Sequence, residues 1–282
     1  MLKFLKRDHP RKRGAAPKFG FFAVMGNLRL KEPELEQVLL VTGGSRGIGA
    51  ATARLAAASG YAVAVNFTAN AAAADEVVRA IEGAGGRAMA VQADVAQEDQ
   101  VLSMFEAVDR KLGRLTALVN NAGVVDVAAR LDEMSFARLR RMFDINVMGS
   151  LLCAREAVRR MSTRHGGKGG AIVNVSSAAS RLGSPAQYLD YAAAKGAIDA
   201  FTLGLAKEVA AEGIRVNAVR PGLIETEIHA SGGIPDRVQQ LAHLVPMQRG
   251  GTAEEVAEAI LWLLSPQASY TTMSLVDVSG GR

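Results

Sequence analysis

The sequence contains little cysteine, few aromatic residues and no long apolar run. Cys153 is the only cysteine among the 282 residues, so no internal disulfide can form and we expect a reducing, cytoplasmic environment. Aromatic residues make up 5% of the chain, whereas its 29 glycines suit helices that pack tightly on a sheet. No apolar stretch reaches the roughly 18 residues of a membrane-spanning helix, so we expect no membrane partner.

Histidine is scarce as well. The four copies are scattered along the chain at His9, His165, His229 and His243. No cluster of His, Cys and Asp has the spacing of metal ligands, so we predict no metal site. His229 lies in the segment after Thr226, where it could contact a small-molecule substrate.

Acidic residues are almost missing from the first part of the chain. Residues 1–31 hold nine Lys or Arg and a single acid, Asp8, whereas the remainder holds 24 basic and 27 acidic residues. We therefore predict that residues 1–36 form a disordered basic extension, with Met25 as an alternative start. Such a tail could bind nucleic acid with salt-dependent affinity, but we expect a solvated extension and no nucleic-acid partner.

From residue 38 onward, short apolar runs alternate with amphipathic stretches. The predicted strands are Val38–Thr42, Ala62–Phe67, Ala88–Gln92, Ala117–Asn120, Ala171–Ser176, Arg215–Val219 and Ser274–Val278. The predicted helices are Ile48–Ser59, Ala71–Glu82, Gln97–Leu112, Phe136–Met161, Tyr191–Ala211 and Ala253–Leu264, the last with a capping box at Thr252 and Glu255. This alternation predicts one doubly wound α/β domain over residues 37–282. Residues 222–250 interrupt it and predict a long loop of the kind that lines binding sites.

Glycines cluster where the first predicted strand meets the first predicted helix. Residues 42–49 read Thr-Gly-Gly-Ser-Arg-Gly-Ile-Gly. Glycines at such a turn let the backbone approach a pyrophosphate, and the helix N-terminus supplies free N–H groups. We therefore predict a dinucleotide site that includes Gly43, Ser45, Arg46, Gly47, Ile48 and Gly49.

Residues 43–47 also fit the Gly-x-Ser-x-Gly elbow of hydrolases, which joins a strand to a helix as well. A hydrolase would need an acid and a histidine farther along the chain, and His165, His229 and His243 are available. It would also need strands and an oxyanion loop before the elbow, whereas only the basic extension precedes residue 38. The dinucleotide interpretation is therefore favoured.

The residues at the end of the second predicted strand indicate which dinucleotide the chain binds. NAD-binding units usually carry an acid about 20 residues after the glycines, for the ribose 2′-hydroxyl, but residues 66–70 read Asn-Phe-Thr-Ala-Asn. No carboxylate stands there to repel a 2′-phosphate, and the Arg46 guanidinium could bind that phosphate. With Asn66 and Thr68 as further hydrogen-bonding partners, we predict NADP(H) as the cofactor.

Tyr191 and Lys195 stand four residues apart in a predicted helix, so their side chains share one face. A nearby ammonium lowers the pKa of a tyrosine, which could then exchange a proton with a carbonyl or alcohol oxygen. Ser176 and Ser177 follow a predicted strand, where a hydroxyl faces the crevice in which α/β proteins bind ligands. Asn146 lies in the middle of a predicted helix, where asparagine is unfavourable, and so invites a role.

Together these segments resemble the short-chain dehydrogenases/reductases. The resemblance covers Val38 to Arg282. It rests on TGGSRGIG at 42–49, Asp94-Val95, NNAG at 120–123, Asn146, the serines at 176–177, YAAAK at 191–195, and Arg220-Pro221-Gly222 with Ile224 and Thr226. It implies a single Rossmann domain with a seven-stranded parallel sheet, and homotetramers or homodimers built partly from the helices that carry Asn146 and Tyr191.

The resemblance also implies roles for individual residues. Tyr191 would be the catalytic acid/base, with Lys195 lowering its pKa and binding the nicotinamide ribose. Ser177 would polarise the carbonyl, and Asn146 would hold a water in a proton relay through Lys195. The remaining cofactor contacts would be Asp94, Val95, Asn120, Ala122, Gly123, Pro221, Gly222, Ile224 and Thr226.

Two positions depart from the family's pattern. Ser177 and Tyr191 are 14 residues apart where many members have 13, so Ser176 stays open as the alternative to Ser177. Residues 183–190 could absorb the extra residue. Near the C-terminal end, Met273 stands where members usually have glycine, which bears on the packing of the last strand.

The predicted activity is hydride transfer between NADP(H) and a small-molecule carbonyl or secondary alcohol. The alternative is a non-catalytic NADP-sensing protein on the same fold, although such proteins typically lose the Tyr–Lys pair. Sugars, 3-oxoacyl thioesters, steroids and small ketones all fit, because a fold alone does not name a substrate.

Overall fold

Seven parallel strands form one sheet in the described part of the computed structural model, which comprises residues 37–228, 232–234 and 236–282. The strands are β1 (Val38–Val41), β2 (Ala62–Phe67), β3 (Arg87–Gln92), β4 (Ala117–Asn120), β5 (Gly170–Val175), β6 (Ile214–Pro221) and β7 (Leu275–Val278). Their order across the sheet is β3-β2-β1-β4-β5-β6-β7. The predicted doubly wound α/β fold is therefore confirmed. The predicted extension over residues 1–36 lies outside the described residues.

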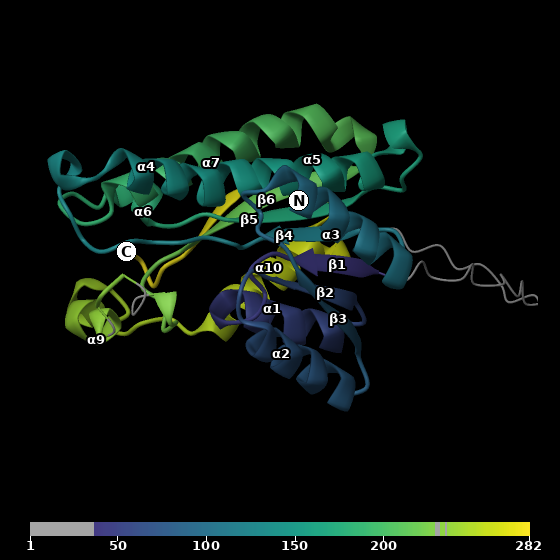
Figure 1. Cartoon of the computed structure of the whole chain (residues 1–282), viewed down its shortest axis with the longest axis horizontal. Helices are drawn as coiled ribbons and strands as arrows, with labels where there is room; N and C mark the ends of the chain where they lie inside the picture. Colours follow the sequence, from purple (N-terminus) through teal and green to yellow (C-terminus); the bar gives the residue numbers. More distant parts are fainter. Residues whose placement is uncertain (1–36, 229–231, 235) are drawn as a thin grey trace, which may run out of the picture. The chain divides into compact units, whose positions relative to one another are not determined.

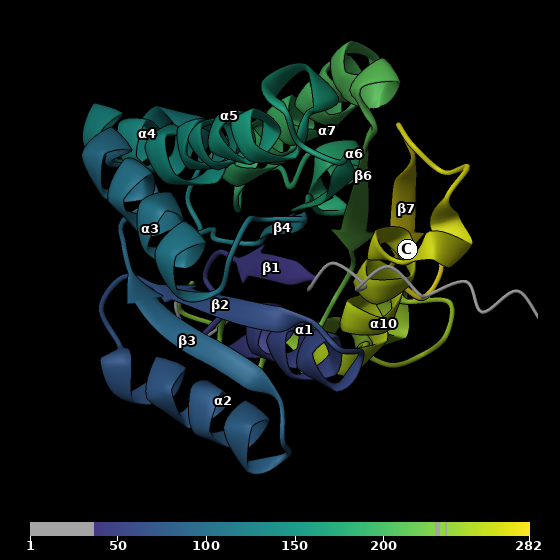
Figure 2. The same cartoon turned by 90° about the vertical axis from the view of Figure 1, so that its right-hand side faces the viewer.

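Helices cover both faces of the sheet (Figures 1 and 2). One face carries α1 (Gly47–Ala58), α2 (Ala71–Gly83) and α10 (Ala253–Leu264). The other carries α3 (Glu98–Lys111), α4 (Phe136–Phe143), α5 (Gly149–Met161) and α7 (Leu189–Val209). Two short helices, α6 (Ala179–Leu182) and α9 (Arg237–Leu241), follow β5 and β6 along the chain.

The central strands are buried on both sides, as expected of a parallel sheet between two helical layers. In β1, Val38 and Leu40 pack into the core under α3, α5 and α7. Leu39 and Val41 pack into the core under α1, α2 and α10. Continuous apolar runs are therefore what these strands require.

The predicted helix over residues 136–161 is interrupted. A π-helical turn, Asp144–Met148, separates α4 from α5 and contains Asn146. Such single turns are frequent at functional sites. Apolar periodicity cannot reveal this turn, because it shifts the helix by one residue without ending it.

Two features near the C-terminal end stand out in the sequence, the capping box at Thr252 and the methionine at position 273. The capping box of α10 is confirmed, since the Thr252 side chain accepts from Glu255 N and the Glu255 carboxylate accepts from Thr252 N. Met273 has a φ of +64°, a left-handed conformation that favours glycine. The backbone before β7 therefore takes a shape suited to glycine although methionine stands there, and Met273 N still donates to Val216 O at 2.7 Å.

Candidate active site

The candidate site lies where the chain reverses its direction across the sheet. β1 is followed by α1 on one face, whereas its neighbour β4 leads through α4 and α5 on the other face. Ligands of open α/β sheets bind beyond the carboxyl ends of strands at such a point. The turns after β1, β4, β5 and β6 therefore form the expected place for a cofactor and a substrate.

The glycine turn after β1 leaves no room for side chains. Gly43 and Gly47 have φ angles of +60° and +51°. A Cβ on Gly43 would lie 3.0 Å from Ala122 Cα, and one on Gly49 would lie 2.5 Å from Asn121 Nδ2. The N-terminus of α1 has no side-chain cap, so its first N–H groups are open to an anion.

Two residues outside the predicted site hold this turn in place. Thr42 Oγ1 accepts from Asn121 N at 2.9 Å and from Ala122 N at 3.0 Å. The Asn121 amide donates to Thr42 O and Gly43 O, both at 2.9 Å. The glycine turn and the segment after β4 are thus bound to each other, which the doubled asparagine at 120–121 alone does not indicate.

Asn66 has a different role from the expected one. Its side chain is 1% exposed; it accepts from Gly43 N at 3.1 Å and donates to Ala93 O at 3.0 Å. The amide therefore fixes the glycine turn to β2 and β3 instead of facing a 2′-phosphate. Thr68 and Arg46 are exposed at this edge of the sheet, and Arg46 lines a second hollow beside Asp126.

The segments after β3 and β4 contribute in two ways. Val95 is buried beneath Gly149 of α5, and Asp94 Oδ1 accepts from Ala96 N at 3.0 Å, which shapes the turn. Asn120 is buried and donates to Asn174 Oδ1 at 2.9 Å. Its side chain thus joins β4 to β5, which differs from the expected contact with a cofactor.

Asn146 and Lys195 meet beside Gly123. A Cβ on Gly123 would lie 2.7 Å from Asn146 Oδ1 and 3.6 Å from Lys195 Nζ. Asn146 Oδ1 accepts from Val124 N, and its amide donates to Val124 O, both at 3.1 Å. The π-helical turn therefore brings the Asn146 amide against the segment after β4. Its predicted water-holding role stays a prediction.

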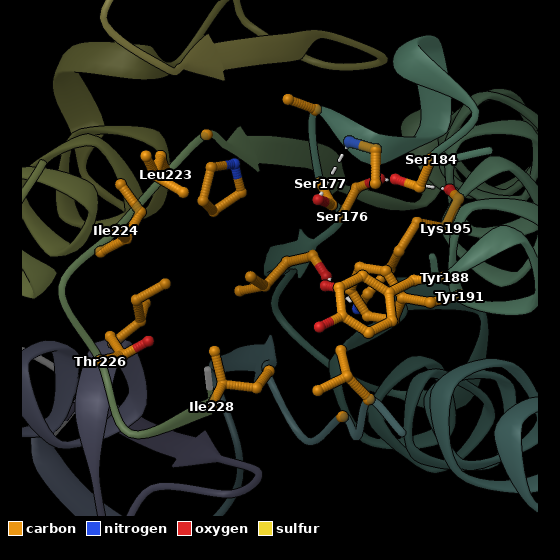
Figure 3. A pocket seen from close by; sticks show the side chains of 18 of the residues that line it. Ser176, Ser177, Ser184, Tyr188, Tyr191, Lys195, Leu223, Ile224, Thr226 and Ile228 are labelled. Atoms are coloured by element: carbon orange, nitrogen blue, oxygen red, sulfur yellow. Dashed lines mark hydrogen bonds between the residues drawn. The ribbon is translucent and has the colours of Figure 1, made fainter. Parts of the chain in front are cut away.

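Ser177, Tyr191 and Lys195 line one cavity, as Figure 3 shows. Tyr191 lies in the first turn of α7, and its side chain is hydrogen-bonded to that of Ser177. Lys195, 4% exposed, donates from Nζ to Val175 O at 2.7 Å, and Nζ lies 5.5 Å from the centroid of the Tyr191 ring. The serine, tyrosine and lysine predicted to act together are thus adjacent.

Burial shifts the pKa values of both Tyr191 and Lys195. Burial raises the pKa of Tyr191 to about 12, and the hydrogen bond with Ser177 opposes part of this rise. Burial also lowers the pKa of Lys195 to about 8, while the Asp199 carboxylate favours its ammonium form. Burial is thus the largest influence on the pKa of Tyr191, and the lowering of this pKa by Lys195 stays a prediction.

Ser176 is engaged elsewhere. It is buried, and its hydroxyl donates to Lys195 O at 3.2 Å. The extra residue between Ser177 and Tyr191 is accommodated in a tight segment where Gly183, Ser184 and Ala186 all have positive φ angles. The geometry therefore favours Ser177 over Ser176 as the hydroxyl beside Tyr191.

The segment after β6 forms the opposite wall. Figure 3 shows Leu223, Ile224 and Thr226 across the cavity from Ser177 and Tyr191. A Cβ on Gly47 would lie 3.2 Å from Thr226 Cγ2, so this segment reaches the glycine turn. Pro221 and Gly222 also line the cavity, whose volume is about 170 Å³.

These features fit a dinucleotide. The glycine turn offers backbone N–H groups and space for a pyrophosphate, and the cavity beside Tyr191 continues from that turn through Ile48 and Asn121. Among the described residues, no histidine serves the hydrolase alternative: neither His165, which precedes β5 at the amino ends of the strands, nor His243 lines the cavity. His229 lies outside the described residues.

The described residues contain no group of three or more His, Cys, Asp or Glu side chains that could hold a metal ion. No helix in the same part of the chain is long and apolar enough to cross a membrane.

Comparison with known proteins agrees with this geometry. Residues 43–282 match the family model described as enoyl-(acyl carrier protein) reductase. The chain is 58% identical to the oxidoreductase YgfF of Escherichia coli (strain K12) over 245 residues, which are 87% of this chain and 99% of that protein. It is 42% identical to cis-4-hydroxycyclohexanecarboxylate dehydrogenase of Sinomonas cyclohexanicum over 87% of this chain and 96% of that protein.

A solved structure shows the same likeness. The crystal structure of a short-chain type dehydrogenase/reductase from Mycobacterium marinum superposes with a TM-score of 0.81 at 35% identity, covering 87% of this chain and 94% of that one. The sequence and structural matches both extend over nearly the whole described unit. The chain therefore belongs to the short-chain dehydrogenase/reductase family and is an oxidoreductase that acts on carbonyl or CH–OH groups.

Proposed function

We propose that the chain interconverts a carbonyl compound and a secondary alcohol with NADP(H), through Ser177, Tyr191, Lys195 and Asn146. The observation that carries the proposal is the hydrogen-bonded pair of Ser177 and Tyr191 on the wall of a cavity, with Lys195 buried behind it. The cavity continues to the glycine turn, where the cofactor would bind. A non-catalytic NADP-sensing protein is the alternative, but it would have no need of this arrangement.

The nicotinamide of the bound cofactor supplies or accepts the hydride. The chain's own task is to bind the substrate oxygen and to move its proton. Tyr191 is protonated at neutral pH, because burial raises its pKa to about 12, and so it can donate a proton to the carbonyl oxygen. Ser177 donates a hydrogen bond to the same oxygen and stabilises the developing charge.

Variants of the two serines and the tyrosine test this assignment. Tyr191→Phe removes the proton donor and is expected to lower kcat by about 10²- to 10⁴-fold. Ser177→Ala removes one hydrogen bond to the developing oxyanion, with a loss of about 10²- to 10³-fold. Ser176→Ala is the matched control and is expected to keep most of the turnover, because its hydroxyl is bound to Lys195 O.

The substrate screen for these variants follows from the relatives. It includes 4-oxocyclohexanecarboxylate, because one relative is named for the corresponding hydroxy acid, together with a 3-oxoacyl thioester, a 3-oxosteroid and glucose. Near-normal turnover by Tyr191→Phe would contradict the assignment of the acid. Binding of NADPH without turnover of any carbonyl or alcohol would favour the sensing alternative.

The preference for NADP(H) is supported by two features of the turn. Arg46 is exposed beside the glycine turn, and the residues that follow β2, from Thr68 to Asn70, include no acid. We expect Arg46→Ala to weaken NADPH binding by about 10- to 100-fold and to leave NADH binding unchanged, since NADH lacks the 2′-phosphate. Fluorescence titration with each cofactor measures both affinities, and tighter binding of NADH by the unaltered chain would refute the preference.

Three further expectations stay proposals: self-association, the cellular location and the start of the folded domain. Self-association into dimers or tetramers is supported by apolar side chains exposed on α4 and the π-helical turn, among them Phe136 and Met148. A cytoplasmic location, predicted from composition, and a folded domain that begins at residue 37, predicted from the alternation of strands and helices, remain predictions.

A further inference from the structure

An arginine without an acidic partner lines the cavity beside Tyr191. The lining includes Lys195, Arg237 and Arg282 but no Asp or Glu. The Lys195 ammonium is already bound to Val175 O. Arg237 comes from α9, in the loop between β6 and α10, and the site described so far gives it no role.

Two neutral contacts hold the Arg237 guanidinium in position. Nη2 donates to Gln187 Oε1 at 2.7 Å, and Cζ lies 5.0 Å from the centroid of the Tyr188 ring. Tyr188 is itself buried, and its hydroxyl donates to Gly232 O at 3.4 Å. Because Gln187 and Tyr188 directly precede the helix that carries Tyr191, the guanidinium is anchored to the same stretch of chain as the catalytic hydroxyl.

The positive charge of Arg237 is not neutralised within the described residues. No ion pair there includes it, and the neighbouring Asp236 carboxylate accepts instead from Gln240 at 2.8 Å. An amide oxygen and an aromatic face orient a guanidinium without cancelling its charge. Its remaining N–H groups are therefore suited to an anion that arrives with the substrate.

The rest of the wall limits the size and the polarity of that substrate. Leu182, Leu223 and Ile228 give it an apolar surface, and the cavity of about 170 Å³ is small compared with the roughly 300–1,000 Å³ of sites for drug-sized ligands. A compact apolar body with one charged end fits these dimensions.

We propose that Arg237 binds a carboxylate of the substrate, so that the enzyme acts on small oxo acids and the corresponding hydroxy acids. The proposal rests on the proposed function, since Tyr191 and Ser177 must hold the reacting oxygen while Arg237 holds the other end. A planar guanidinium matches a carboxylate through two parallel hydrogen bonds. The cofactor's phosphates are the other anions near this site, but they would bind at the glycine turn, on different elements.

The test compares acids with their methyl esters, which keep the carbon skeleton and remove the charge. The full chain with NADPH is assayed on 4-oxocyclohexanecarboxylate, on 4-oxopentanoate and on the methyl ester of each. Arg237→Met keeps the apolar stem, and Arg237→Lys keeps the charge without the planar fork. Arg110→Met is the matched control, because the side chain of Arg110 is 68% exposed on α3, where it pairs with Glu106.

We expect at least one acid to exceed its ester in kcat/KM by about 10- to 100-fold. Arg237→Met is expected to lower the value for the acid by a similar factor and to leave the ester unchanged, with Arg237→Lys between the two. Arg110→Met is expected to change neither. NADPH affinity is expected to be the same in Arg237→Met as in the unaltered chain.

Equal kcat/KM for acid and ester, or an equal loss for both in Arg237→Met, would overturn the assignment and leave the proposed function standing. A fall in NADPH affinity in Arg237→Met would overturn it too, because the arginine would then serve the cofactor. If no carbonyl compound is reduced, the proposed function fails, and calorimetric binding of cyclohexanecarboxylate against its methyl ester decides the matter. Tighter binding of the acid that Arg237→Met abolishes supports the carboxylate site, and equal binding refutes it.

Discussion

At the scale of the residue, the proposed chemistry depends on how the buried Lys195 keeps its proton. Burial lowers its pKa to about 8, and Asp199 is the group that opposes this decrease. Asp199 itself accepts from Arg220 Nε at 3.0 Å. The charge state of the lysine is therefore set jointly by desolvation and by one carboxylate a turn farther along α7.

Asp199→Asn is expected to shift the pH dependence of catalysis. The ammonium form of Lys195 is present below its pKa, so kcat/KM for carbonyl reduction is expected to fall as the pH rises through about 8. Removing the carboxylate lowers the pKa of Lys195 further, which moves the falling limb to lower pH. Profiles of kcat/KM against pH for the two proteins measure the shift.

A falling limb at the same or a higher pH in Asp199→Asn would contradict this account. Arg220 keeps one acidic partner in the variant, because the Asp277 carboxylate lies 3.8 Å from Arg220 Nη1. A circular-dichroism spectrum shows whether the fold is kept.

At the scale of the element, a buried ion pair holds α4 to the start of α7. Arg138 Nε donates to Asp190 Oδ2 at 2.8 Å, and the two side chains are 10% and 0% exposed. Asp190 Oδ1 also accepts from Tyr191 N at 2.9 Å, and Arg138 Nη1 donates to Val127 O at 2.7 Å. The pair therefore positions the first turn of α7, which carries Tyr191.

Arg138→Met is expected to destabilise the fold by about 3–5 kcal/mol, because it leaves the Asp190 carboxylate buried without its partner. The double variant Arg138→Met with Asp190→Leu removes both charges and is expected to regain part of that loss. Urea unfolding of the single and double variants measures the free energy of unfolding. Equal stabilities of Arg138→Met and the unaltered chain would show that the pair contributes nothing.

The π-helical turn also belongs to the scale of the element. A regular helix over residues 136–161 would advance evenly, whereas the turn Asp144–Met148 brings the Asn146 amide onto both backbone groups of Val124. The segment after β4 is thereby held beside Lys195. An asparagine that is unfavourable within a helix is here explained by contacts outside it.

At the scale of the whole described unit, the site arises between segments that are distant in the sequence. The glycine turn comes from the first strand, the segment Asn121–Gly123 from the fourth, Ser177 from the end of the fifth, and Thr226 from beyond the sixth. They meet because all seven strands are parallel and present their carboxyl ends at one edge. Arg237 joins them from a short helix in the loop after β6 and adds a guanidinium to the cavity wall.

The sequence by itself determined the order of strands and helices, because buried parallel strands need continuous apolar runs and their ends need glycine or polar residues. It also determined the pairing of Tyr191 with Lys195, since four residues span one helical turn. Local patterns of this kind involve residues that are close together in the sequence, so the sequence alone shows them. They were enough to predict the fold and to place Tyr191 and Lys195 on one face of a helix.

Only the tertiary structure decided what depends on partners far along the chain. Asn66 and Asn120 turned inward because backbone groups of neighbouring strands satisfy their amides. The pKa of Tyr191 rises because burial outweighs the hydrogen bond with Ser177, and Ser177 is preferred because Ser176 is held by Lys195 O. Burial and hydrogen bonding across more than a few residues are set by packing, and packing is a property of the folded chain.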